Sequence, residues 1–181
     1  MAQIKGEKMG RCLMLIDVQN GFISPETDYV VDRIKYLLEK EHFDHIIATQ
    51  FVNEKGSPYR RFIKWEKLSG PPETDVLDFV KENAEKIFVK NIYSAANDEV
   101  LEFLKKNKVT EIFLSGIDTD CCILKTAADF FEKGIDAKVL SYYTASNGGK
   151  ESRYAAVRVL KRMIGEGQII KSKHISEKKR Q

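Results

Sequence analysis

Short apolar runs alternate with longer amphipathic stretches along most of this 181-residue chain, and this alternation restricts the fold more than any other feature. Most of the apolar runs lack polar alternation, which is typical of strands that are covered on both faces. Repeated strand–helix units of this kind predict an α/β fold with a mainly parallel sheet. The strand candidates are residues 12–16, 46–49, 87–89, 112–114, 137–140 and 168–170.

Helices are expected between these strands, because apolar residues there recur at helical spacing. Asn97 and Ser152 are candidate N-caps, and Gly134 stands where a left-handed residue would end a helix. Residues 51–72, with several Gly, Pro and aromatic residues, are the least regular part and predict an excursion over one edge of a site. No linker or repeat interrupts the pattern, so one domain over residues 1–181 is expected. The helical stretches are residues 30–38, 76–80, 100–104, 123–131 and 155–163.

Charge and composition exclude several classes of protein. The net charge is +3, and the segment 171–181 alone holds five basic residues against one Glu, so the remainder is close to neutral. We expect this basic segment to be a solvated, partly frayed tail, and the body lacks the basic face that nucleic-acid binding requires. No apolar run approaches the roughly 20 residues that span a bilayer. Three cysteines, two of them adjacent, make a poor disulfide framework, which predicts a reducing, cytoplasmic setting.

Three chemically reactive side chains stand at the ends of predicted strands. Asp17 ends the first apolar run, Lys90 ends the third, and Cys122 follows the fourth at the expected start of a helix. In an open parallel sheet, ligands gather outside the carboxyl ends of the strands. An acid, an ammonium group and a thiol are therefore expected to meet at one edge of the sheet.

This set of groups is complete for acyl transfer. A helix N-terminus and a nearby ammonium group can both lower the pKa of a thiol, and Cys122 has both available. Asp17 could take the thiol proton and return it to a leaving group. A purely structural interpretation stands beside this one, in which the cysteines are small buried residues, Asp17 is a turn residue and Lys90 is a solvated strand end.

Three segments carry a resemblance to a known family. Residues 13–22 (LMLIDVQNGF), 89–95 (VKNIYSA) and 116–127 (GIDTDCCILKTA) resemble, in order, the three motifs of the isochorismatase-like cysteine hydrolases. That family includes nicotinamidases and carbamoyl-amide hydrolases. The third motif is the most specific, since its pattern places the nucleophile at Cys122 and not at Cys121.

The resemblance implies a three-layer α/β/α domain with a six-stranded, mainly parallel sheet and a catalytic triad. In that triad Asp17 is the base, Lys90 favours the thiolate and holds the Asp, and Cys122 forms a thioester. The resemblance also implies a cis peptide bond between Ile117 and Asp118. The backbone N–H groups of Asp118 and Cys122 would then form the oxyanion hole.

One departure from the family bears on metal binding. Nicotinamidases of the family carry an Asp-x-His metal motif just after the second strand, where this chain has Phe51 and Asn53. The three histidines, His42, His45 and His174, stand too far away in the sequence to rebuild such a site. We therefore expect no metal and no cofactor.

The aromatic residues predict a pocket for a small molecule, although such residues can equally close a core or a subunit contact. The predicted function is hydrolysis of a small amide, or of a related C–N or ether-type bond, by a homo-oligomer, a dimer or tetramer by analogy. Two alternatives are a non-catalytic binding or scaffolding module and a thiol redox sensor that uses Cys121 and Cys122. The candidate pocket residues are Phe22, Tyr59, Phe62, Trp65 and Tyr93.

Overall fold

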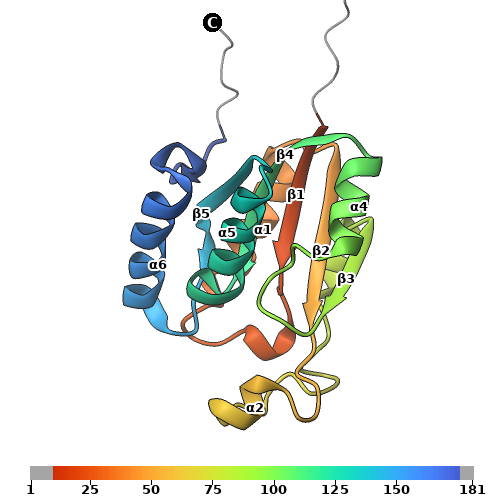
Figure 1. The fold of residues 1–181 in the computed structure, drawn as a ribbon, viewed down its shortest axis with the longest axis vertical. Helices are drawn as coiled ribbons and strands as arrows, with labels where there is room; N and C mark the ends of the chain where they lie inside the picture. The colour runs from red at the N-terminus through yellow and green to blue at the C-terminus, as the bar shows by residue number, and fades with distance from the viewer. Residues whose placement is uncertain (1–9, 176–181) are drawn as a thin grey trace, which may run out of the picture.

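The computed structural model describes residues 10–175, which form one six-stranded parallel sheet with helices on both faces (Figure 1). The strand order β3-β2-β1-β4-β5-β6 reverses its direction between β1 and β4, which is where ligands bind in sheets of this kind. The predicted α/β/α class and all six predicted strands are confirmed. The strands are β1 (Gly10–Ile16), β2 (His45–Phe51), β3 (Lys86–Lys90), β4 (Val109–Ile117), β5 (Ala137–Ala145) and β6 (Ile169–Ile170).

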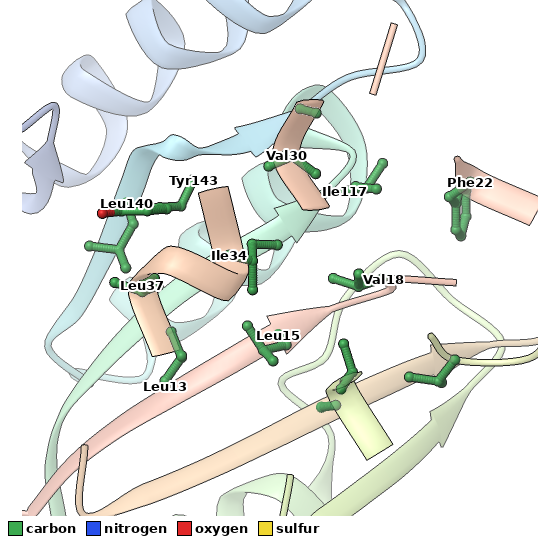
Figure 2. Packing of buried hydrophobic residues seen from close by; sticks show 14 of the residues in the cluster. Leu13, Leu15, Val18, Phe22, Val30, Ile34, Leu37, Ile117, Leu140 and Tyr143 are labelled. Atoms are coloured by element: carbon green, nitrogen blue, oxygen red, sulfur yellow. The ribbon is translucent and has the colours of Figure 1, made fainter. Parts of the chain in front are cut away.

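Residues of β1 show how the sheet separates two cores. Cys12, Met14 and Ile16 pack with apolar residues of α4, α5 and α6, whereas Leu13 and Leu15 pack with residues of α1 and α3. Figure 2 shows the second of these cores, in which Leu13 and Leu15 lie next to α1. Successive side chains of a strand point to opposite faces, so a strand covered on both faces needs an unbroken apolar run. The helices are α1 (Tyr29–Lys40), α2 (Pro58–Phe62), α3 (Asp78–Asn83), α4 (Asp98–Lys106), α5 (Leu124–Glu132) and α6 (Gly149–Ile164).

Strands β4 and β5 extend beyond the apolar runs that predicted them. Their continuations contain Ser115, Ser141 and Thr144, which are buried although they are polar. The Ser115 hydroxyl donates to the Tyr143 carbonyl at 2.8 Å, and the Ser141 hydroxyl donates to the Ile170 carbonyl at 3.2 Å. Because these hydrogen bonds satisfy the buried hydroxyls, polar residues continue the strands where hydropathy indicates an end.

The helix ends confirm two predictions and correct one. The Asn97 side chain accepts a hydrogen bond from the Val100 N–H at 3.0 Å and caps α4. Gly134 follows α5 with a φ of +72°, a left-handed conformation that glycine adopts readily. Ser152 does not cap α6, because that helix begins at Gly149. The first turn of α6 carries no apolar stripe, so hydropathy placed its start too late.

Part of the basic segment 171–181 packs on the body instead of being fully solvated. Ile175 is buried, and its N–H donates to the Glu41 carboxylate at 3.1 Å. The Tyr143 hydroxyl donates to the Lys173 carbonyl at 2.6 Å. Residues 176–181 lie outside the described residues. Within residues 10–175, no helix has the length and apolarity needed to cross a membrane.

Candidate active site

Asp17, Lys90 and Cys122, here called the strand-end cluster, meet at the carboxyl edge of the sheet. Asp17 directly follows β1, Lys90 is the last residue of β3, and Cys122 lies in the π-helical turn Thr119–Ile123 between β4 and α5. The three side chains come from segments far apart in the sequence, yet all three are buried. The topology thus brings together the acid, the ammonium group and the thiol.

Lys90 is the centre of this cluster. Its Nζ lies 2.6 Å from Asp17 Oδ2 and 3.5 Å from Cys122 Sγ. The same ammonium group donates to the carbonyl oxygens of Ile92 at 3.0 Å and Tyr93 at 3.2 Å. A buried ammonium group requires charged or polar partners on every side, and these four supply them. Lys90 is therefore held in one position between the carboxylate and the thiol.

Thr49 fixes the other oxygen of Asp17. The Thr49 hydroxyl donates to Asp17 Oδ1 at 2.6 Å and accepts from the Asp17 backbone N–H at 3.1 Å. Asp17 itself has a φ of +52°, a left-handed conformation that is uncommon for residues other than glycine. Side chain and backbone of Asp17 are thus both held by one buried threonine of β2.

Burial raises the pKa of the Cys122 thiol well above its usual range, and the charge of Asp17 raises it further, whereas the charge of Lys90 lowers it. The charge of Lys90 thus acts in the direction that the family resemblance implies. Almost complete burial outweighs the attraction of one ammonium group that is already paired, so the direction of the shift favours the protonated thiol.

Lys90 stays charged in the same surroundings. Burial lowers its pKa, but the charge of Asp17, with hydrogen bonds to Asp17 and Cys122, raises it above its usual value. The resting cluster thus pairs a carboxylate with an ammonium group beside a neutral thiol. Transfer of the thiol proton to Asp17 would leave the total charge of the cluster unchanged, so the buried site gains no net charge when the thiolate forms.

The turn that carries Cys122 lies close to β1. Gly116 has a φ of +122°, and a Cβ atom built on it would lie 2.1 Å from the Ile16 carbonyl oxygen. Only glycine permits this approach, which places the end of β4 beside Asp17. The peptide bond between Ile117 and Asp118 is cis, at the position that the family resemblance indicates. The N–H groups of Cys121 and Ile123 both donate to the Asp118 carbonyl, at 3.3 and 3.1 Å.

A pocket of about 290 Å³ opens over the thiol. Four of the five predicted pocket residues line it: Phe22, Tyr59, Trp65 and Tyr93. Phe62 does not line it. This side chain is 72% exposed and lies along a neighbouring groove, because α2 turns it outward. The sequence shows that α2 is aromatic but not which ring faces the thiol. The lining is completed by Phe51, Ile63, Asp118, Cys121 and Cys122.

Phe51 and Asn53 occupy the positions where the metal motif of nicotinamidases is expected, and neither is available as a ligand. The ring of Phe51 lines the pocket, with its centroid 5.0 Å from Lys90 Nζ. His42 and His45 lie at or before the start of β2, at the opposite end of the sheet from Asp17. Within residues 10–175, no group of three or more His, Cys, Asp or Glu side chains could hold a metal ion. The residues therefore do not fit a metal centre.

Asn53 instead holds the wall of the pocket in place. Its Nδ2 donates to the carbonyl oxygens of Trp65 at 2.9 Å and Lys67 at 3.0 Å, and its Oδ1 accepts from the Ser57 hydroxyl at 2.5 Å. The Asn53 N–H donates to the Leu68 carbonyl at 2.7 Å. One buried amide thereby ties both ends of the loop that carries Tyr59 and Trp65.

Sequence reasoning missed three positioning residues. Thr49 counted only as a strand former, Phe51 was considered only as the replacement of a metal ligand, and Gln19 was unremarked within the first motif. The Gln19 side chain donates to the Phe51 carbonyl at 2.9 Å and accepts from the Phe51 N–H at 2.7 Å, which joins the ends of β1 and β2. A polar residue in or after a buried strand is the signal that could have drawn attention to Thr49 and Gln19.

Comparisons with known proteins agree with this architecture. The model of the isochorismatase domain matches residues 11–168. Isochorismatase family protein 1B of Dictyostelium discoideum is 31% identical over 152 residues, which are 81% of this chain and 68% of that protein. The nicotinamidase/pyrazinamidase of Mycobacterium tuberculosis is 28% identical over 160 residues, covering 75% of this chain and 86% of that enzyme.

A solved structure shows the same fold. The isochorismatase-like hydrolase from Alkaliphilus metalliredigens superposes with a TM-score of 0.77 at 19% identity, over 89% of this chain and 94% of that one. The domain match spans nearly all the described residues, from the start of β1 to the residue before β6. On this evidence the chain belongs to the isochorismatase family.

Proposed function

We propose that this protein is a cysteine hydrolase that cleaves a small amide, or a related C–N or ether-type bond, through a thioester on Cys122. The observation that carries the proposal is the position of Lys90 Nζ, 2.6 Å from Asp17 and 3.5 Å from Cys122 Sγ, beneath a pocket of small-molecule size. The name of the Mycobacterium tuberculosis relative, a nicotinamidase/pyrazinamidase, supports amide chemistry.

The reaction begins with transfer of the thiol proton to Asp17 as the sulfur attacks the carbonyl carbon of the amide. The C–S bond forms, and the carbonyl oxygen takes the electron pair of the C=O bond. Asp17 then returns the proton to the leaving nitrogen as the C–N bond breaks, which releases the amine. Water attacks the thioester with Asp17 again accepting a proton, and the acid leaves with the thiol restored. Lys90 keeps the cluster electrically neutral throughout.

The developing oxyanion needs hydrogen-bond donors close to Cys122. We assign this role to two backbone N–H groups, that of Asp118, which belongs to the cis peptide bond itself, and that of Cys122 in the turn that follows. Donors fixed in a water-poor site stabilise such a charge strongly, because they need no reorganisation during the reaction.

The proposed reaction uses no metal and no cofactor, since Phe51 and Asn53 leave no ligands at the family's metal position. A small molecule is the proposed substrate, and neither a membrane nor nucleic acid is a proposed partner. The expectations of a cytoplasmic location and of a dimer or tetramer stay predictions, and light scattering of the purified protein measures the second.

The two alternatives have less support. A redox sensor requires a readily ionised thiol, yet burial, together with Asp120 and Asp118, raises the pKa of Cys121 to about 12, and the pKa of Cys122 is raised as well. A non-catalytic module would not require a buried carboxylate and ammonium group beside a thiol, an arrangement that is costly in folding energy.

Intact-mass spectrometry after incubation with a panel of small amides tests the proposed function. We expect an acyl adduct on Cys122, identified by peptide mapping, and release of the corresponding acid. Cys122→Ala is the matched control and should show neither. Acid release by Cys122→Ala, or adducts confined to Cys121 in the parent protein, would overturn the assignment of the nucleophile.

A further inference from the structure

Asp118 contributes the only carboxylate among the residues that line the pocket over Cys122, within the described part of the chain. Its Oδ1 accepts two hydrogen bonds from Asn147, from the backbone N–H at 2.7 Å and from Nδ2 at 3.0 Å. Asn147 Nδ2 also donates to the Phe22 carbonyl at 3.2 Å, which anchors the pair. The carboxylate is therefore held rigidly, with Oδ2 left for another partner.

No cationic side chain between residues 10 and 175 forms an ion pair with Asp118. Lys90, the cation of the strand-end cluster, is paired with Asp17. Burial raises the pKa of Asp118, and the charges of Asp120 and Asp17, which have the same sign as its own, raise it further. The pocket thus carries an uncompensated negative charge when Asp118 is ionised.

The rest of the pocket wall is aromatic. The rings of Phe22 and Trp65 are stacked with centroids 6.0 Å apart, and those of Phe51 and Trp65 lie 5.9 Å apart. Tyr59 and Tyr93 meet edge to face at 5.0 Å. Aromatic rings attract cations through their electron-rich faces, and a carboxylate adds direct charge attraction. A carboxylate in an aromatic pocket is chemistry that suits an ammonium or amidinium group.

The position of Asp118 also bears on catalysis. Its backbone N–H is one of the two proposed oxyanion donors, so its side chain lies close to the place where negative charge develops. An unpaired carboxylate there opposes that charge by repulsion, and the opposition is removed when a cation neutralises the carboxylate. A neutral substrate would leave the repulsion in place.

We propose that the substrate is a small amide bearing a positively charged group, which Asp118 binds inside the aromatic pocket. That the substrate is an amide rests on the proposed hydrolase function, whereas its positive charge is inferred from the pocket alone. Asp118 is accordingly a specificity-determining residue whose side chain touches the substrate.

Modification of Cys122 by charged thiol reagents tests the inference without requiring hydrolysis. Three methanethiosulfonates are compared, carrying a neutral methyl, a trimethylammonium-ethyl or a sulfonatoethyl group, and rates are measured by mass spectrometry in a Cys121→Ser background. Each rate is divided by that of a small free thiol with the same reagent. We expect the cationic reagent to react at least about tenfold faster than the anionic one, and Asp118→Asn to remove most of this preference.

Asp118→Asn is a conservative variant, because its amide oxygen still accepts both hydrogen bonds from Asn147. Asp118→Ala provides a second variant, and thermal melts check that both are folded. Asp120→Asn is the matched control, since it removes the same charge only two positions along the chain. The Asp120 carboxylate accepts a hydrogen bond from the Ser146 hydroxyl and does not line the pocket. This variant should change the preference less than about twofold.

An unchanged preference in folded Asp118→Asn or Asp118→Ala would overturn the inference. An equal loss of the preference for the cationic reagent in Asp120→Asn would also overturn it, because that result would indicate a long-range electrostatic effect and not a binding contact. The outcome is separable from that of the proposed function. A charge preference without any acyl adduct would refute the hydrolase and retain cation binding, whereas adducts without a charge preference would refute only cation binding.

Discussion

The strand-end cluster and the wall of the pocket are built in different ways. Asp17, Lys90 and Cys122 are placed by parallel strands and the turn that follows one of them, and each is almost completely buried. The wall, by contrast, is built in part by the loop between β2 and α3, which supplies Tyr59, Ile63 and Trp65 and is held by hydrogen bonds from Asn53 to loop carbonyls. In the proposed reaction, the strand ends would supply the reacting groups, and the loop would supply part of the pocket's selectivity. Each prediction below tests one side of that division.

The largest effect is expected in the cluster itself. Cys122→Ala should abolish turnover, and Asp17→Asn and Lys90→Met should each lower kcat by about 10² or more, because the proposed proton transfer needs all three groups. Initial rates measured beside circular dichroism melts check this, and the losses should not add in double variants. A folded Lys90→Met protein with near-normal turnover would remove Lys90 from the mechanism.

Thr49→Val should lower kcat by about 10- to 100-fold with little change in KM, because Asp17 loses the hydroxyl that orients it. Steady-state kinetics separate the two parameters. Thr49→Ser restores the hydroxyl and should recover most of the rate. A fall in stability without a fall in kcat would assign Thr49 a structural role and weaken the view that β2 serves the reaction.

On the other side of the comparison, Trp65→Ala should raise KM by about tenfold while kcat changes less, since the indole lines the pocket and is not one of the proposed reacting groups. Phe62→Ala is the matched control. Its ring is exposed and outside the pocket, so KM should stay within about twofold. If Trp65→Ala lowered only kcat, the pocket wall would take part in the chemical step. The proposed separation between the strand-end cluster and the pocket wall would then be wrong.

Asp118→Asn should stabilise the protein at pH 8 by about 1 kcal/mol. Burial raises the pKa of Asp118 to about 6, with a further contribution from Asp120 and Asp17 that the Asn147 hydrogen bonds oppose. The folded state therefore holds this proton more tightly than the unfolded state, and its stability falls as the pH rises from about 4 to about 6. Denaturant melts of both proteins at pH 4 and pH 8 measure the difference, which should nearly vanish at pH 4. A variant less stable at both pH values would contradict this account.

The smallest effect is expected from removal of metal. Because Phe51 and Asn53 supply no ligands, incubation with EDTA should leave kcat and KM unchanged within error. Loss of activity that zinc or iron restores would reveal a metal site built from other residues. The strand-end cluster would then not be the only source of reacting groups.

The sequence predicts the strand-end side of the molecule better than the pocket side. Buried parallel strands produce apolar runs, so Asp17 and Lys90 are conspicuous where such runs end. The role of Thr49 is hidden because it forms part of a strand. The outward position of Phe62 depends on how α2 is held by the loop, and contacts to backbone carbonyls leave no periodic pattern. The sequence does not show that burial raises the pKa of Cys122, because only the assembled fold creates that burial.

The hydrogen bonds of Asn53 have a consequence for protein engineering. Hydrogen bonds within the loop hold its two ends together. They join Asn53 to Ser57 and to the carbonyl oxygens of Trp65, Lys67 and Leu68. Chimeric proteins should therefore exchange residues 53–68 as one segment, with the junctions placed just outside this hydrogen-bond network. Point-by-point redesign within it would leave an orphaned buried amide, whereas a complete transplant carries its own internal support to a new host.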